Sequence, residues 1–204
     1  VPMTTGRLKA YFERFGASAS RTDVELVHFS MSQEIDAFLR ERWDAELVNT
    51  ARAAVDAGLA PVAGFSIYTW NAADFLRAIA HVRRTCPGIS VVVGGPHVQR
   101  AQDFLYVDGI DVVVLGEGEA TFQELLDTPE RAHWDGIDGL AFLRDGELVK
   151  TKERERCLDL DSLPSALAAS VEERWGPVER APRFRAGRIV ISGVQLGATF
   201  VGIQ

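Results

Sequence analysis

The chain has 204 residues, 47% of them hydrophobic and 25% charged, and its net charge is −7. This composition predicts a globular domain with a sizeable core and excludes a disordered or fibrous chain. The net negative charge argues against a nucleic-acid or anionic-membrane partner. No apolar run approaches the ~20 residues that span a bilayer. The first residues lack the pattern of a signal peptide, so the sequence predicts a cytoplasmic protein.

Residues 22–130 alternate strand and helix patterns. Short apolar runs bounded by turns predict strands, and apolar residues at helical spacing predict helices. The predicted strands cover residues 24–29, 62–68, 90–93 and 111–115. The predicted helices cover residues 34–58, 71–85, 99–106 and 118–127. Strands that are apolar on both faces and alternate with helices predict an α/β fold, with a doubly wound parallel sheet covered on both sides.

Two of these helices carry more specific predictions. The helix over residues 34–58 is expected to turn its apolar positions inward, namely Ile35, Phe38, Leu39, Ala45, Val48, Ala51 and Val55. Asn71 is a plausible N-cap for the helix that ends near Thr85, because its side chain can accept a hydrogen bond from the first turn.

The pattern changes after residue 130. Two short apolar runs at 140–143 and 147–150, joined by an Asp-Gly turn, predict a β-hairpin. A charged, extended connector follows, and from Arg180 onward the chain has four arginines and no acidic residue. We therefore expect an α/β domain at residues 1–130, a hairpin and linker at 131–165, and an atypical tail at 166–204.

Three predicted strands end in loops that could contact a ligand, since ligands of open parallel sheets bind beyond the carboxyl ends of the strands. The candidate residues are Ser66, Tyr68, Thr69, Trp70 and Asn71 in the first loop, Gly94, Gly95, Pro96 and His97 in the second, and Gly116, Glu117, Gly118 and Thr121 in the third. Paired glycines let a bulky ligand approach the backbone, although they also make tight turns. The aromatic side chains either stack on a large ring system or pack on a neighbouring helix.

Missing motifs narrow the class of ligand. There is no phosphate-binding P-loop, and Gly116-Glu117-Gly118 lacks the third glycine of a dinucleotide fingerprint. Carboxylates at this helix N-terminus would repel a pyrophosphate and favour a ligand with hydroxyl or amide N–H donors. His97 fits a hydrogen-bonding role better than a metal ligand, and Ser66 lacks the GxSxG setting of an acyl-transfer nucleophile. The sequence thus predicts no catalytic residue and no metal ligand.

The two cysteines, Cys86 and Cys157, are too few for a disulfide framework and lack the spacing of a zinc knuckle. Each is predicted to be a buried or half-buried thiol rather than a reactive one.

A family resemblance is carried by four segments: FSIYTWN at residues 65–71, VVVGGPHV at 91–98, VVLGEGEATF at 113–122 and GIDGLAF at 136–142. They resemble the N-terminal cobalamin-binding domain of B12-dependent radical SAM enzymes. LDLDSLPS at residues 158–165 resembles the linker that precedes the radical SAM barrel there. The resemblance covers residues 5–165, approximately.

This resemblance implies a flavodoxin-like, Rossmann-type fold that holds cobalamin at the carboxyl edge of the sheet. The first loop would lie near the lower face of the corrin, and the other two would line the nucleotide tail and the corrin amides. In such enzymes cobalamin accepts a methyl group from S-adenosylmethionine and passes it to a substrate radical. The DxHxxG motif of other B12 proteins is absent here, as it commonly is in the radical SAM group.

Two features depart from the family pattern. Relatives have an apolar strand before the segment resembling residues 6–11, so a central strand is expected to be missing, and the apolar residues 188–203 are expected to pack at the edge it leaves. The Cx3Cx2C motif for a [4Fe–4S] cluster needs three cysteines, so S-adenosylmethionine and the cluster are expected only in a full-length relative. The chain is not expected to be catalytic alone, and a radical SAM barrel domain or chain would be its partner. The alternative is a flavodoxin-like binding or regulatory module for another ligand or a protein partner.

Overall fold

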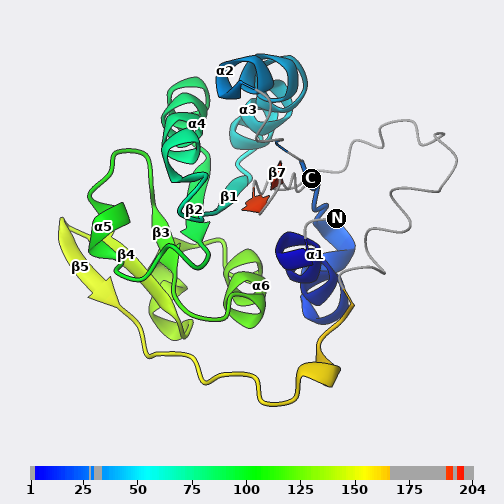
Figure 1. Cartoon of the computed structure of the whole chain (residues 1–204), viewed down its shortest axis with the longest axis vertical. Helices are drawn as coiled ribbons and strands as arrows, with labels where there is room; N and C mark the ends of the chain where they lie inside the picture. The colour runs from blue at the N-terminus through cyan, green and yellow to red at the C-terminus, as the bar shows by residue number, and fades with distance from the viewer. Residues whose placement is uncertain (1–2, 28, 30–33, 166–191, 195–196, 200–204) are drawn as a thin grey trace, which may run out of the picture.

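The computed structural model of the chain describes residues 3–27, 29, 34–165, 192–194 and 197–199. Its centre is a five-stranded sheet in which the strands lie in the order β1-β2-β3-β4-β5 (Figure 1). The strands are β1 (Val62–Ser66), β2 (Ser90–Gly94), β3 (Val112–Val114), β4 (Leu140–Arg144) and β5 (Glu147–Lys150). The first three are parallel, and β4 and β5 pair antiparallel with their neighbours, so the sheet is mixed.

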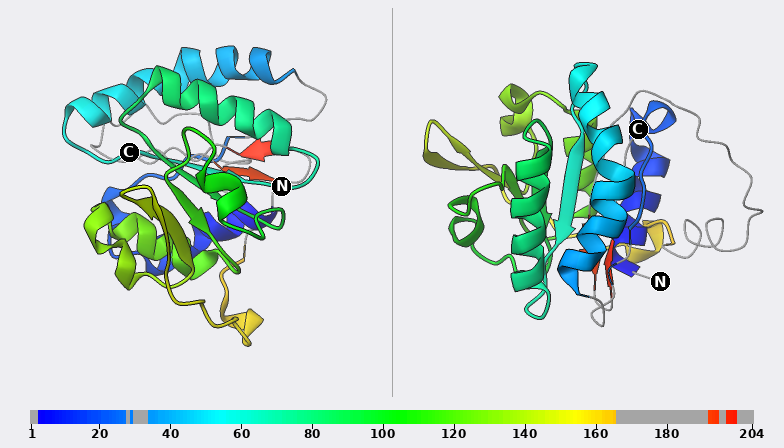
Figure 2. Two further views of the ribbon diagram at one scale, coloured as in Figure 1. Left: turned by 90° about the vertical axis from the view of Figure 1, so that its left-hand side faces the viewer. Right: turned by 90° about the horizontal axis from the view of Figure 1, so that it is seen from above.

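Helices cover both faces of this sheet (Figure 2). One face carries α2 (Ile35–Phe38), the helical stretch η2 (Leu39–Leu47), α3 (Val48–Asp56), α4 (Ala72–Thr85) and α5 (Gln102–Leu105). The other carries α1 (Met3–Phe15) and α6 (Glu119–Asp127), together with the short turns η1 (Ala19–Arg21) and η3 (Arg131–Gly136). Val91 and Val93 of β2 enter the first core and Val92 enters the second, as the two-residue period of a strand requires. The predicted α/β fold with a sheet covered on both sides is confirmed.

Most predicted elements agree with observed ones to within a few residues. The hairpin of β4 and β5 is confirmed, and its turn residues Asp145 and Gly146 both have positive φ, 53° and 82°. Paired positive φ values are typical of the tight turn whose twist matches that of the strands. The helix predicted over residues 99–106 is shortened to α5.

The prediction that Ala45 faces inward is wrong. Ala45 is exposed, and Trp43 and Leu47 are buried in its place. The reason is that η2 is a π-helix, whose wider turns bring residues about four apart, such as Leu39, Trp43 and Leu47, onto one face.

The predicted strand at residues 24–29 is not paired in the sheet. Val24, Val27 and Phe29 are nevertheless buried, because they pack into the two cores. An apolar extended segment signals burial, whereas pairing also needs a free strand edge supplied by a distant part of the chain.

The edge of β1 lies beside a two-stranded antiparallel hairpin of β6 (Ser192–Val194) and β7 (Gly197–Thr199), which also contacts α1 (Figure 1). These six residues agree with the β pattern predicted for the tail; the other tail residues lie outside the described part of the chain. No helix within the described residues combines the length and the apolar character needed to cross a membrane.

Candidate functional site

The first two candidate loops are joined through their backbones at the carboxyl ends of β1 and β2. The amide of Ile67 donates to the carbonyl of Gly94 at 2.6 Å, and the amide of His97 donates to the carbonyl of Ile67 at 3.1 Å. Gly95 has a φ of +106°, and a Cβ atom there would lie only 2.7 Å from the carbonyl oxygen of Ile67. This close approach requires glycine, which the pair Gly94-Gly95 supplies.

Ser66 provides the most informative polar atom of the site. Its Oγ is buried and has no hydrogen-bond partner among the described residues. It lies 3.0 Å from the position that a Cβ of Gly95 would occupy, where the first two loops pack closely on each other. An unsatisfied buried hydroxyl costs about 1–3 kcal/mol, so a water molecule or a polar ligand group that pairs with Ser66 Oγ would stabilise this end of the sheet.

Asn71 shapes the first loop from within. Its Oδ1 accepts a hydrogen bond from the amide of Tyr68 at 2.8 Å, and its Nδ2 donates to the carbonyl of Ser66 at 3.2 Å. Asn71 is the N-cap residue of α4, as predicted, but its side chain makes no cap bond to the helix. The buried amide group instead satisfies backbone groups of the loop, which holds the chain between Ser66 and Asn71 in one conformation.

The two aromatic side chains of the first loop differ in how far they are exposed to solvent. Tyr68 and Trp70 are stacked, with ring centroids 4.8 Å apart and an interplanar angle of 22°. Tyr68 is buried and its hydroxyl is 3.2 Å from the Oγ1 of Thr4 on α1, whereas Trp70 is 45% exposed. Trp70 therefore leaves a flat apolar surface open beside the loop backbone.

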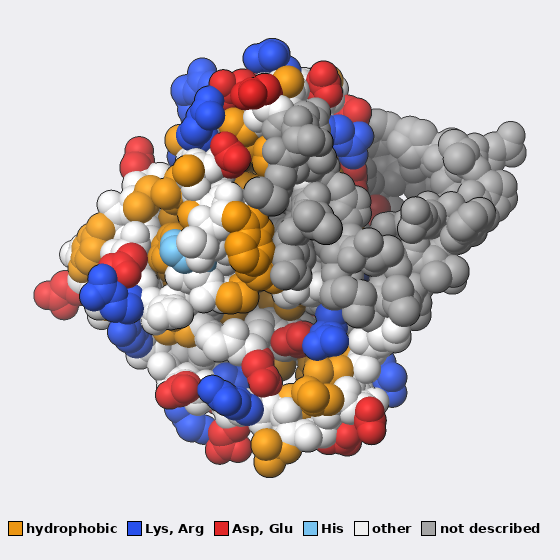
Figure 3. Space-filling model, in the orientation of Figure 1, with side chains coloured by type: hydrophobic (Ala, Val, Ile, Leu, Met, Phe, Trp, Pro, Cys, Tyr) orange, Lys and Arg blue, Asp and Glu red, His pale blue; other side chains and the backbone are white. Residues whose placement is uncertain are grey.

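Figure 3 views this end of the sheet and shows hydrophobic side chains gathered beside an exposed histidine. His97 is exposed and its Nδ1 lies 3.3 Å from the Oγ1 of Thr69, a contact that links the second loop to the first. Pro96, next to it, is also exposed. Among the described residues, no group of three or more His, Cys, Asp or Glu side chains is placed to hold a metal ion.

The third loop follows β3, whose Val114 lies against Gly94. Gly116 has a φ of +74°, and no atom lies within 4 Å of the position of its missing Cβ, so this part of the loop is open. One carboxylate oxygen of Glu117 accepts a hydrogen bond from the amide of Cys157 at 2.7 Å. Gly118 lies over Leu8 of α1.

Thr121, which was predicted to belong to the third loop's site, is bonded inside the protein. It is fully buried, its hydroxyl donates to the carbonyl of Asp138 at 2.9 Å, and it accepts from the Nε of Arg154 at 2.7 Å. Its predicted contact with a cofactor remains a prediction. Arg154 and Thr4 were not expected at this site, because their partners lie tens of residues away in sequence and no local pattern marks them.

A shallow apolar pocket lies at the opposite, amino ends of β1 and β2. Val62, Ser90 and Trp134 are among the residues that line it. It is separated from the three loops by the length of the strands.

The fold and the loops together define a flavodoxin-like α/β domain whose open carboxyl edge offers a glycine-lined approach, an unsatisfied hydroxyl and an exposed aromatic ring. Residues 18–126, more than half of the chain, match the family model of the B12 binding domain. The chain belongs to this family, as its four resembling segments predicted, and cobalamin is the cofactor class of the family.

Several known proteins are similar to parts of the chain. A cobalamin-dependent radical SAM methyltransferase, TokK of Streptomyces tokunonensis, is 35% identical over 108 residues, which are 50% of this chain and 16% of that protein. A 2-(S-pantetheinyl)-carbapenam-3-carboxylate methyltransferase of Streptantibioticus cattleyicolor is 36% identical over 99 residues, 47% of this chain and 14% of that protein. An uncharacterized methyltransferase of Pyrococcus horikoshii, PH0819, is 35% identical over 79 residues, 37% of this chain and 17% of that protein. The chain therefore matches less than a fifth of the length of each of these relatives.

The residues at the carboxyl edge fit the cofactor of this family. Cobalamin is bulky and rich in amides, and it would be received by a polar atom that lacks a partner, Ser66 Oγ, beside the point where Gly95 lets the first two loops pack together. The open position at Gly116 and the exposed ring of Trp70 leave room for a large ligand between the loops and solvent.

Proposed function

We propose that this chain holds cobalamin across its three strand-end loops and serves as the B12-binding part of a methyl-transfer system whose radical SAM part acts with it. The observation that carries the proposal is the buried, unpartnered hydroxyl of Ser66 beside Gly95, at the edge where this class of fold receives its ligands. The similar proteins are methyltransferases by name, which supports the methyl-transfer context.

Each loop has a separate part in this proposal. Ser66 would donate a hydrogen bond to the ligand, and Gly95 would let the second loop pack closely on the first. Trp70 would pack its exposed ring on an apolar face of the ligand, while Asn71 keeps the loop in place. The carboxylate of Glu117 would accept from amide N–H groups of the ligand with the oxygen that does not bind Cys157. When bound, cobalamin supplies a cobalt centre that can take up and pass on a methyl group.

Equilibrium dialysis with hydroxocobalamin tests the proposal. We expect the wild-type chain to retain the corrin, with an absorbance spectrum in which dimethylbenzimidazole is displaced from cobalt. Failure of the wild-type chain to retain any corrin would overturn the proposal.

Ser66→Ala gives a sharper test, because it should raise the stability of the cofactor-free protein and lower its affinity for the cofactor. Removing an unsatisfied buried hydroxyl should stabilise the cofactor-free protein by about 1 kcal/mol, and it should weaken binding of hydroxocobalamin about tenfold. Ser90→Ala is the matched control, since Ser90 lines the pocket at the amino end of the same sheet and should leave binding unchanged. Equal binding by both variants would contradict the role given to Ser66.

A further inference from the structure

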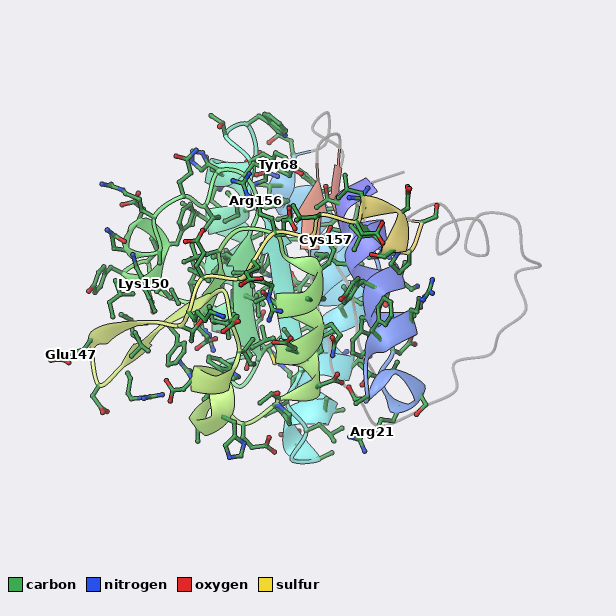
Figure 4. The ribbon with its side chains drawn as sticks, turned by 90° about the horizontal axis from the view of Figure 1, so that it is seen from below. Arg21, Tyr68, Glu147, Lys150, Arg156 and Cys157 are labelled. Carbon is green, nitrogen blue, oxygen red and sulfur yellow. The ribbon has the colours of Figure 1, made fainter. Side chains whose placement is uncertain are left out.

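The connector after β5 returns along α6 to the end of the molecule that carries the loops. We call residues 152–157 the strap. In Figure 4, Tyr68 of the first loop and Arg156 and Cys157 of the strap lie at one end of the molecule, and Arg21 lies at the other. The strap ends just before the short turn η4 (Leu160–Ser162).

Arg154 joins the strap to the start of α6. Its Nε donates to the hydroxyl of Thr121 at 2.7 Å, and its terminal nitrogen Nη2 donates to the carbonyl of Asp138 at 3.3 Å and forms an ion pair with Glu124. The side chain of Arg154 is 19% exposed, so these bonds are largely shielded from water. Because Thr121 lies in the first turn of α6, Arg154 fixes the helix immediately after the third loop.

The strap is also linked to Leu115, just before the third loop, and to Glu117 within that loop. The amide of Leu115 donates to the carbonyl of Gly139 at 2.8 Å, and the amide of Gly139 donates to the carbonyl of Lys152 at 2.7 Å. Within the loop, Glu117 accepts from the amide of Cys157. The third loop is therefore tied to the strap before, within and after its glycines, while Gly116 itself faces open space.

We propose that Arg154 and Glu117 are positioning residues through which the strap sets the conformation of the third loop. The part of the inference that concerns a ligand rests on the proposed function. If the strap is loosened, the loop spends less time in its binding conformation, and the apparent affinity for the ligand falls by the same fraction. By the same linkage, a bound ligand that holds the loop also holds the strap.

Hydrogen exchange of the full chain without cofactor tests the positioning. We expect Arg154→Ala to speed amide exchange about tenfold in residues 115–122 and in the strap, because it removes charge-assisted hydrogen bonds that are largely buried. Arg144→Ala is the matched control: Arg144 of β4 is paired with Asp135 of η3, and its loss should leave the loop unchanged. Arg154→Lys keeps the charge but loses the planar fork, so it should restore only part of the protection.

Equal exchange of residues 115–122 in Arg154→Ala and Arg144→Ala would overturn the proposal. If Arg154→Ala does not fold, Glu117→Ala answers the same question from an exposed position, and it should speed exchange at the amide of Cys157 and in the loop. Unchanged exchange in that variant would also overturn it.

Hydroxocobalamin supplies the second arm of the test. It should slow exchange in the strap of the wild-type chain, and Arg154→Ala should weaken its binding about tenfold. Binding without any slowing of the strap would overturn the coupling. Absence of binding to the wild-type chain would instead overturn the proposed function, whereas the exchange comparison without cofactor would still decide the positioning role of Arg154.

Discussion

Substituting Gly95 by alanine tests whether the stability of the protein depends on direct backbone contact between the first and second loops. A methyl group at Gly95 would meet the carbonyl oxygen of Ile67 at 2.7 Å, its amide nitrogen at 2.8 Å and the Oγ of Ser66 at 3.0 Å. The first two atoms are backbone and cannot move aside without shifting the end of β1. The positive φ adds a further cost of about 1–2 kcal/mol for any residue with a Cβ.

The matched control is Gly58→Ala, at the end of α3. Gly58 also has positive φ, +75°, but no atom lies within 4 Å of its Cβ position, so its substitution carries only the conformational cost. Overpacking of a tight site costs about 1–3 kcal/mol in addition. We therefore expect Gly95→Ala to lower the free energy of unfolding by about 2 kcal/mol more than Gly58→Ala does, which corresponds to a melting temperature about 4–8 °C lower.

Urea unfolding followed by circular dichroism measures both variants on the same scale, and hydroxocobalamin dialysis then shows whether Gly95→Ala also closes the site. The double variant Ser66→Ala, Gly95→Ala should remain destabilised, since the two closest contacts are with the backbone of Ile67. Equal destabilisation by Gly95→Ala and Gly58→Ala would refute the argument that the loops require this close approach.

Three further predictions concern single side chains. Trp70→Ala is expected to open a coordination position on bound cobalamin and so to change its cobalt(II) EPR spectrum; an unchanged spectrum would mean that the ring serves only in packing. Burial raises the pKa of the Cys86 thiol, whereas Cys157 is half-buried, so a disulfide reagent should modify Cys157 first and Cys86 only on unfolding. Mass spectrometry after timed labelling checks this order, and faster labelling of Cys86 would contradict it. Burial alone would raise the pKa of Asp127, but hydrogen bonds from the hydroxyl and amide of Ser18 outweigh it and lower the pKa. The stability from these bonds is present above the unfolded carboxyl pKa of about 3.9 and is lost as the pH falls through the lower folded value. Asp127→Asn should therefore cost about 1 kcal/mol at pH 7 and much less near pH 2, and a cost that is independent of pH in urea titrations would count against this assignment.

Local sequence patterns predicted the elements that depend on neighbours in the chain. The buried strands β1 to β3, the helices α4 and α6 and the turn at Asp145-Gly146 each carry their signal within a few residues. The carboxyl-edge loops could be found for the same reason, because their glycines and aromatic residues follow directly on those strands.

The failures come from an irregular helix and from interactions between distant segments. The π-turns of η2 moved Ala45 out of the core, and nothing in the residues around it marks the extra residue per turn. The bonds from Arg154 to Thr121 and from Cys157 to Glu117 depend on how the chain folds back on itself. Such contacts have no period and no spacing rule, so sequence reasoning could identify the loops without showing what holds them.

The hairpin at the far end of the sheet has a consequence for how copies of this protein meet. β5 forms one edge of the five-stranded sheet and presents backbone groups that another strand could pair with. It is only four residues long, and its terminal residues Glu147 and Lys150 are exposed at the outer rim of the molecule (Figure 4). A second β5 laid antiparallel along this edge would bury few apolar atoms because the strand is short, and the exposed Glu147 and Lys150 that would face each other across the pair would contribute little. The edge thus discourages sheet-to-sheet association by its own chemistry, and concentrated solutions of the domain are protected from one common route to aggregation.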